Sequence, residues 1–228
     1  MSGKQKIISQ NDYERAGKRF ELYIRESDLL LRSDEYIVVH LDGVKFTGQK
    51  CKNLSVTCKK YVFDCLTQTA INLCNKFKSA RVVYVAGDEI SILLDGSCVK
   101  ENYHNIVQKI ISLFVSSATL LFNIELKKYN GKDKGQLNIF LNDGLFAAKA
   151  YNINSEMVND YFKWRLLSCK KLIFDRREKF EEKIDWEKYG ALITFKNRKW
   201  TADKVDFEQS KLCKQPQDEH YILGGNKH

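Results

Sequence analysis

The stretch "YIVVHLDGVKFTG" (residues 36–48) begins as an apolar, β-branched run and then places an acid directly before a glycine. The run at 36–41 predicts a buried strand. Asp42-Gly43 has two interpretations, because Asp-Gly is a strong hairpin signal and an aspartate at a strand end can also be a metal ligand. The rest of the chain must decide between an ordinary turn and a metal site.

Periodic apolar residues divide the remaining sequence into elements. Helical spacing predicts helices at 55–73, 103–122 and 155–172, and strand-like runs occur at 81–86, 90–94, 136–141, 145–151 and 189–195. Only "GDE", residues 87–89, separates the strands at 81–86 and 90–94, which predicts a tight hairpin. No repeat or linker interrupts the pattern. We therefore expect one domain at 1–200, with an N-terminal helix and a C-terminal helical extension, and a polar tail at 201–228.

The order of these elements predicts an α+β fold, a ferredoxin-like βαββαβ sheet with helices on one face, plus an additional C-terminal helix and strand. A right-handed crossover makes the first and second strands parallel, with room for the third between them. The hairpin then returns the third strand antiparallel to the second. Asp42, at the end of the first strand, and Asp88, in the hairpin, are therefore expected at the same edge.

Two neighbouring carboxylates repel each other unless a cation lies between them. Mg²⁺ prefers oxygen ligands and keeps several waters, so two carboxylates and substrate phosphates suffice to bind it. Gly43 would let its backbone carbonyl approach the ion. Two ions about 3.5–4 Å apart can activate a hydroxyl and stabilise a leaving pyrophosphate. We therefore expect a metal site at Asp42, Gly43 and Asp88; the alternative is two exposed turns without function.

The charge of the chain favours a polyanionic partner. It carries 38 Lys+Arg against 29 Asp+Glu, a net charge of +9, and lysines that neutralise phosphates release counterions. Trp164 and Arg165 could stack on a base or bind a phosphate, and Lys170 and Lys171 could contact an RNA backbone. The alternatives are a core position for Trp164 and a solvated charged face for the lysines.

The expected compartment is reducing. The seven cysteines form no CxxC pair, so neither a zinc site nor a disulfide framework is indicated. No apolar run approaches the length that crosses a bilayer, and no membrane association is expected. We expect a cytoplasmic protein; a short mitochondrial presequence is the alternative, which Asp12 and Glu14 disfavour.

Four segments carry a family resemblance, "YERAGKRFE" (13–21), "YIVVHLDGVKF" (36–46), "VAGDEISILL" (85–94) and "SEMVNDYFKWR" (155–165). In this order, they resemble the tRNA-His guanylyltransferase family and its guanylyltransferase-like relatives, which are 3′–5′ nucleotide polymerases. The resemblance covers about residues 13–172. It implies a palm-like domain that uses GTP and ATP to extend an activated 5′ end of RNA, and a homo-oligomer, commonly a tetramer.

The resemblance also implies roles for single residues. Asp42 and Asp88 would bind two Mg²⁺ ions with the carbonyl of Gly43, and Glu89 would support the site. Val44, Lys45 and Phe46 would follow the metal turn in the position that faces the nucleotide triphosphate. Lys149 would take the place of a later arginine of the family.

Several positions depart from the family pattern. Val44 stands where the family has arginine, Gly87 where it has serine, and "FAAK" (146–149) where it has Phe-Asp-Gly/Ala-Arg, so that Ala147 replaces an acid. "LLSCKKLIFDR" (166–176) replaces an asparagine-rich segment. These departures favour the broader guanylyltransferase-like branch over strict tRNA-His specificity.

The sequence therefore predicts a metal-dependent nucleotidyltransferase acting on the 5′ end of tRNA or a related RNA, in repair or maturation. Two alternatives remain at this stage. One is a palm-type synthetase of cyclic nucleotides or oligonucleotides, because such enzymes also place acids in a hairpin like "GDE". The other is a catalytically degenerate RNA-binding relative.

Overall fold

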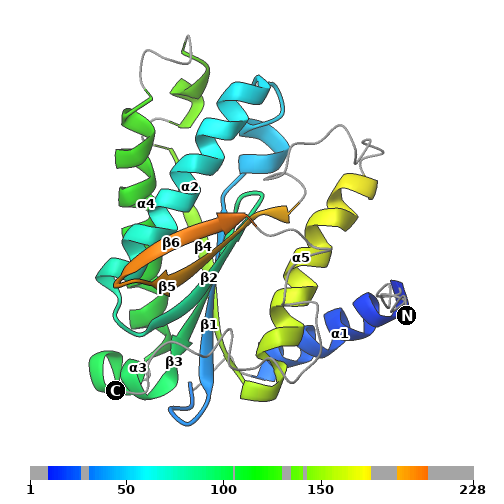
Figure 1. The fold of residues 1–228 in the computed structure, drawn as a ribbon, viewed down its shortest axis with the longest axis vertical. Helices are drawn as coiled ribbons and strands as arrows, with labels where there is room; N and C mark the ends of the chain where they lie inside the picture. The colour runs from blue at the N-terminus through cyan, green and yellow to red at the C-terminus, as the bar shows by residue number, and fades with distance from the viewer. Residues whose placement is uncertain are drawn as a thin grey trace.

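The computed structural model describes residues 10–26, 31–104, 106–129, 135–140, 143–175 and 189–204. The elements follow the chain in this order (Figure 1): α1 Gln10–Glu26, β1 Tyr36–Gly43, the π-helix η1 Phe46–Lys50, α2 Val56–Lys76, β2 Ala80–Ala86, β3 Glu89–Asp95, α3 Gly96–Tyr103, α4 Val107–Lys127, the 3₁₀-helix η2 Gln136–Phe140, β4 Phe146–Ile153, the 3₁₀-helix η3 Ser155–Met157, α5 Val158–Asp175, β5 Ala191–Lys196 and β6 Lys199–Lys204.

The strands form one six-stranded sheet in the order β4-β1-β3-β2-β5-β6, in which all neighbouring strands are antiparallel. Strand β3 lies between β1 and β2, so β1 and β2 run parallel to each other, as the crossover argument predicted. The β2–β3 hairpin has a two-residue turn, and Gly87 occupies its first position with φ 59°. A residue without a side chain adopts this left-handed conformation at no steric cost.

Helices cover both faces of the sheet (Figure 1). On β1, Ile37, Val39 and Leu41 pack in one buried cluster with α2 and α4, whereas Val38 belongs to a second cluster with α1 and α5. The βαββαβ core with its two crossover helices on one face is therefore confirmed. The additional C-terminal helix, α5, lies with α1 against the opposite face, which the sequence pattern had not located.

Three element predictions differ from the structure. Residues 136–141 were expected as a strand, but 136–140 form η2, in which Leu137 and Phe140 are buried three residues apart; this spacing suits a 3₁₀-helix. The helix predicted at 103–122 begins at Val107 and ends at Lys127, because the separate helix α3 ends at Tyr103. The division after residue 200 falls inside β6, and 205–228 lie outside the described residues.

Among the described helices, α4 is long and apolar enough to cross a membrane. The expectation that no apolar run reaches this length was therefore wrong. The face of α4 that carries Ile110, Phe114, Ala118 and Phe122 is buried in the cluster formed with α2 and the sheet. A helix that contributes to a protein core passes the same test of length and composition.

Candidate active site

Strand alternation collects polar side chains on the α1/α5 face of the sheet. Because successive side chains point to opposite faces, His40 and Asp42 follow Val38 onto this face. Register then adds their neighbours: Asp42 pairs with Glu89 and Ala147, and His40 pairs with Ser91 and Lys149. The end of the sheet where β1 stops is therefore polar on this face and apolar on the other.

Asp42 and Asp88 meet at this end, as the topology predicted. The backbone N–H of Gly43 donates to the carbonyl of Asp88 at 3.0 Å. Burial and the Asp88 charge raise the pKa of Asp42, and the nearby charges of Arg165 and Lys149 oppose this rise. Within the described part of the chain, the Asp42 carboxylate has no hydrogen-bond or ion-pair partner. Asp42 is therefore held close to Asp88, and the neighbouring cations do not fully offset the rise in the pKa of Asp42.

The turn after Asp42 is held by aromatic packing. A Cβ added to Gly43 would lie 2.6 Å from the ring of Phe46, so the chain passes this ring more closely than any side chain allows. Phe46 is 0% exposed. Its ring centroid lies 5.2, 4.9 and 5.5 Å from those of Phe122, Phe140 and Phe146. The side chain of Phe46 is thus part of the core. Only the backbone of Phe46 could contact a nucleotide as the sequence predicted.

The neighbours of Phe46 are placed differently. Lys45 is exposed and left-handed, with φ 61°. The N–H of Val44 donates to the carbonyl of Leu145 at 2.9 Å and fixes the turn to the chain before β4. Lys50, which sequence reasoning did not single out, is buried and forms an ion pair with Asp143 at 2.8 Å. No local pattern near Lys50 indicates this partner, which lies far away in the sequence.

Glu89 is engaged from α5. The Arg165 guanidinium, which is buried, forms an ion pair with Glu89 and lies over the Trp164 ring, 4.9 Å from its centroid. On the other side, His40 Nε2 lies 3.7 Å from Glu89 Oε1. Burial, Arg165 and Lys149 lower the pKa of His40 to about 3. The imidazole is therefore neutral at physiological pH.

A hydrogen-bonded row continues from His40 into α5. His40 Nδ1 lies 3.0 Å from Ser91 Oγ, and the Tyr161 hydroxyl donates to the same oxygen at 3.1 Å. The spacing of His40 from Asp42, two residues along a strand, is the sequence signal that both side chains lie on the same face of the sheet.

The residues predicted to contact RNA lie along α5. Trp164 stacks on Phe20 of α1, with centroids 5.3 Å apart, and lies 5.9 Å from Tyr161. Trp164 therefore joins α5 to α1, as in its alternative interpretation as a core residue, and Arg165 is occupied by Glu89. The helix includes Lys170 and Lys171, whose side chains lie outside the described residues. The RNA contacts of these four residues stay predictions.

The donor set fits a hard divalent cation. Two carboxylates, from Asp42 and Asp88, and the carbonyl of Gly43 are oxygen ligands of the kind that Mg²⁺ takes when waters and substrate phosphates complete its shell. No group of three or more His, Cys, Asp or Glu side chains suited to a metal occurs in the described ranges. This agrees with Glu89 being engaged by Arg165 rather than grouped with the two aspartates.

Comparisons with known proteins identify the family and the fold of this chain. The family model described as Thg1, tRNAHis guanylyltransferase, matches residues 15–153. A bacterial tRNA(His) guanylyltransferase (Thg1)-like protein solved with GTP is similar, with 22% identity and a TM-score of 0.65 over 91% of this chain and 98% of that one. The complex of such a protein with ATP gives 20% identity with the same TM-score and coverage.

The tRNA(His) guanylyltransferase of Saccharomyces cerevisiae is 20% identical, with a TM-score of 0.58 over 82% of this chain and 97% of that one. At identities this low, the likeness to these three solved structures shows a shared fold and nothing further. The comparison with curated proteins gave no match. The family match spans more than half of the chain and includes Asp42, Gly43, Asp88 and Glu89. The chain therefore belongs to the tRNAHis guanylyltransferase family, and it is a nucleotidyltransferase that acts on the 5′ end of tRNA.

Proposed function

We propose that this enzyme uses two Mg²⁺ ions to add nucleotides in the 3′–5′ direction to the 5′ end of tRNA or a related structured RNA. The observation that carries the proposal is the meeting of Asp42 and Asp88, with the raised pKa of Asp42 as its electrostatic consequence. Two acids that had only a structural role would rarely lie together beside a surface that binds polyanions, because their charges repel each other and the RNA.

Asp42, Asp88 and the carbonyl of Gly43 would hold the ions. When bound, Mg²⁺ supplies Lewis-acid activation of a hydroxyl and neutralises charge on a leaving phosphate group. The chain's own residues arrange the substrates. Lys45, exposed directly after the metal turn, provides a cation for the triphosphate, and Lys149 provides another, opposite His40 on β4.

The reaction joins the 3′-hydroxyl of an incoming nucleotide to the 5′ end of the RNA. The hydroxyl loses its proton and attacks the phosphorus nearest the RNA, and a new P–O bond forms. The bond to pyrophosphate breaks if the RNA carries a triphosphate, and the bond to AMP breaks if ATP has adenylylated the end. The GTP and ATP complexes of the bacterial relatives support these two nucleotides as substrates.

The surroundings of the site support a polyanionic substrate. The net charge of +9 favours RNA, and exposed lysines lie beside the acids at positions 45 and 149. We further propose a homo-oligomer, with four copies as the first assembly to test, and a cytoplasmic location.

An incorporation assay tests the proposal. Purified enzyme is incubated with labelled GTP or ATP and a panel of intact and 5′-truncated tRNAs, with Mg²⁺ or with EDTA. We expect Mg²⁺-dependent labelling of at least one truncated RNA, which EDTA and Asp88→Ala abolish. Cyclic or oligomeric products formed without RNA would replace the proposal with a palm-type synthetase. RNA binding without any transfer would favour the degenerate relative.

Binding of the ion is measured separately. Mg²⁺ that binds only the folded protein stabilises it by about 2.7 kcal/mol at 100 times its dissociation constant. We expect Mg²⁺ to raise the melting temperature of the wild type and not that of Asp42→Asn. Equal shifts in both proteins would count against Asp42 as a ligand.

A further inference from the structure

Each oxygen of the Glu89 carboxylate lies near a side chain that either belongs to α5 or is hydrogen-bonded to α5 through Ser91. Arg165, on α5, forms the ion pair with Oε2. His40 lies 3.7 Å from Oε1, and it is joined through Ser91 to Tyr161, which is also on α5. A helix on the face of the sheet therefore determines where a carboxylate beside the candidate metal turn can lie.

Arg165 has little freedom to move. Its side chain is 10% exposed, and its guanidinium lies over Trp164, which stacks on Phe20 of α1. Leu166, the next residue, is 1% exposed and belongs to the buried cluster that includes Phe20. Separating the pair would leave the buried guanidinium of Arg165 without a compensating charge, so the position of Glu89 follows the position of α5.

This ion pair has a consequence for the acids at the edge. Glu89 is adjacent to Asp88 in the chain and opposite Asp42 across the β1–β3 ladder. A free carboxylate at this position would be a third oxygen ligand close to the other two. In the described residues, however, no metal-suited group of three such side chains forms, and Arg165 occupies Glu89 instead.

We propose that Arg165 is a positioning residue of the nucleotidyltransfer site, which holds the Glu89 carboxylate out of the metal ligand set and leaves Asp42 and Asp88 as the pair that binds Mg²⁺. This inference rests on the proposed function. It makes correct metal binding depend on the packing of α5 against the sheet. Arg165 acts through Glu89 and needs no contact with substrate.

A double-mutant cycle tests the proposal, with Arg165→Met, Glu89→Gln and both changes together. Mg²⁺ affinity is measured by titration calorimetry without nucleotide, and kcat and KM are measured in the incorporation assay. In Arg165→Met the freed carboxylate joins the ligand set, so we expect Mg²⁺ to bind several-fold more tightly while kcat falls by about 10–100-fold.

The double variant distinguishes positioning from a general loss of structure. Glu89→Gln removes the carboxylate that Arg165→Met releases. We therefore expect the double variant to bind Mg²⁺ within about twofold of the wild type and to recover at least about tenfold in kcat over Arg165→Met. Effects that simply multiply, or an Arg165→Met variant that binds Mg²⁺ as the wild type does or more weakly, would overturn the proposal.

Two further variants serve as controls. Lys163→Met removes a cation two residues away on α5 and should leave Mg²⁺ affinity and kcat within about twofold. Arg165→Lys keeps the charge without the planar fork and should show a smaller change of the same kind. If Arg165→Met does not fold, as judged by circular dichroism, Arg165→Lys takes its place in the cycle with the same expected directions.

The two proposals fail in different ways. A wild type that transfers no nucleotide to any RNA would end the proposed function, while the Mg²⁺ titrations would still test Arg165. An active wild type whose Mg²⁺ affinity is unchanged by both Arg165 variants would end only this inference.

Discussion

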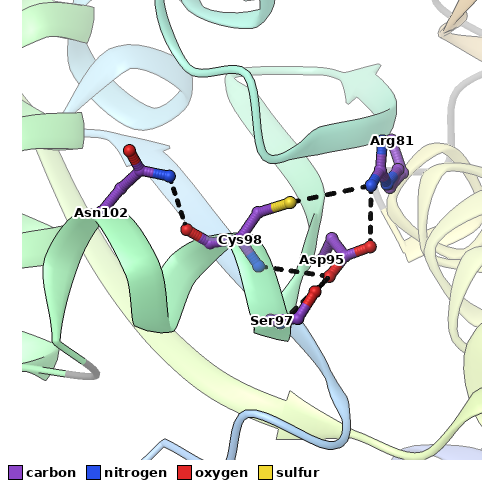
Figure 2. Close-up of polar contacts among 5 residues, drawn as sticks. All are labelled: Arg81, Asp95, Ser97, Cys98 and Asn102. Carbon is purple, nitrogen blue, oxygen red and sulfur yellow. Dashed lines mark hydrogen bonds and ion pairs between the residues drawn. The ribbon is translucent and has the colours of Figure 1, made fainter.

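The β1–β3 ladder carries an aspartate near each end, Asp95 and Asp42, and of these two only Asp95 has hydrogen-bond and ion-pair partners for its carboxylate among the described residues. At the far end, Asp95 pairs with Tyr36 and caps the N-terminus of α3. Its carboxylate accepts hydrogen bonds from the backbone N–H of Ser97 at 3.0 Å and from Arg81 at 2.7 Å (Figure 2). At the site end, the Asp42 carboxylate has no such partner in the described part of the chain.

The pKa values of these acids shift in opposite directions. Burial raises the pKa of Asp95, but hydrogen bonds from Ser97 and Arg81 outweigh it, so the pKa is lowered. Burial and Asp88 leave the pKa of Asp42 raised. A satisfied acid stabilises the fold, whereas an acid held against another acid costs free energy until a cation arrives. This difference separates a structural carboxylate from a functional one within a single ladder.

The largest expected effect is on the incorporation rate, and it compares aspartate substitutions at the two ends of the β1–β3 ladder. Asp42→Asn and Asp88→Asn each remove a ligand charge, so we expect the incorporation rate to fall by more than about 10³-fold. The matched change Asp95→Asn should leave the rate within about threefold. A similar loss of activity in all three variants would show that the two ends do not differ in function.

Substitution of the glycines near Asp42 and Asp88 should give the next largest effect, a loss of stability. In Gly43→Ala the new Cβ would meet the Phe46 ring at 2.6 Å, so we expect a loss of about 1–3 kcal/mol in the free energy of unfolding and a lower rate. The control, Gly87→Ala, has open space but a φ of 59°, and should cost about 1 kcal/mol. Urea unfolding would measure both, and a smaller loss for Gly43→Ala would contradict the packing argument.

Removal of the satisfied acid should affect stability alone. Asp95→Ala deletes the cap of α3 and leaves Arg81, 34% exposed, without its carboxylate partner. We expect the free energy of unfolding to fall by about 1–2 kcal/mol with an unchanged incorporation rate. Thermal unfolding and the assay together check this; a loss of activity in the folded variant would connect the far end to the reaction.

The pH dependence of stability gives the smallest effect and should have opposite signs at the two ends. Without metal, the raised pKa of Asp42 means that its stabilising contribution is present in acid and lost as the pH rises through the folded pKa. Asp42→Asn should therefore gain a few tenths of a kcal/mol at pH 7, and this gain should vanish below about pH 4.

Asp95 should behave in the reverse way, because its folded pKa is lowered. Its contribution is present above the unfolded pKa and lost as the pH falls through the folded value. Asp95→Asn should thus lose stability at pH 7 and approach the wild type in acid. Urea titrations between pH 3 and pH 7 compare the two variants. A change of the same sign in the free energy of unfolding at pH 7 would contradict the pKa direction given for one of the two acids.

Local and topological rules were enough to predict the core of the fold and the meeting of the two acids. Strand periodicity located β1, β2 and β3, and crossover handedness then required Asp42 and Asp88 to share an edge. These rules failed at 136–141, because the short apolar run "QLNIFL" suited a strand although residues 136–140 form a 3₁₀-helix. A short apolar run does not distinguish these two structures.

What the sequence by itself determined is the alternation along β1, the tight hairpin at residues 87–89 and hence the two-carboxylate edge. Only the tertiary structure decided which partner each side chain meets: Arg165 for Glu89, Asp143 for Lys50, and an aromatic core for Phe46. Period and handedness are properties of the backbone and its nearest neighbours. Partners distant in sequence depend on how α5 and the loops pack, which is set by the sum of many weak contacts.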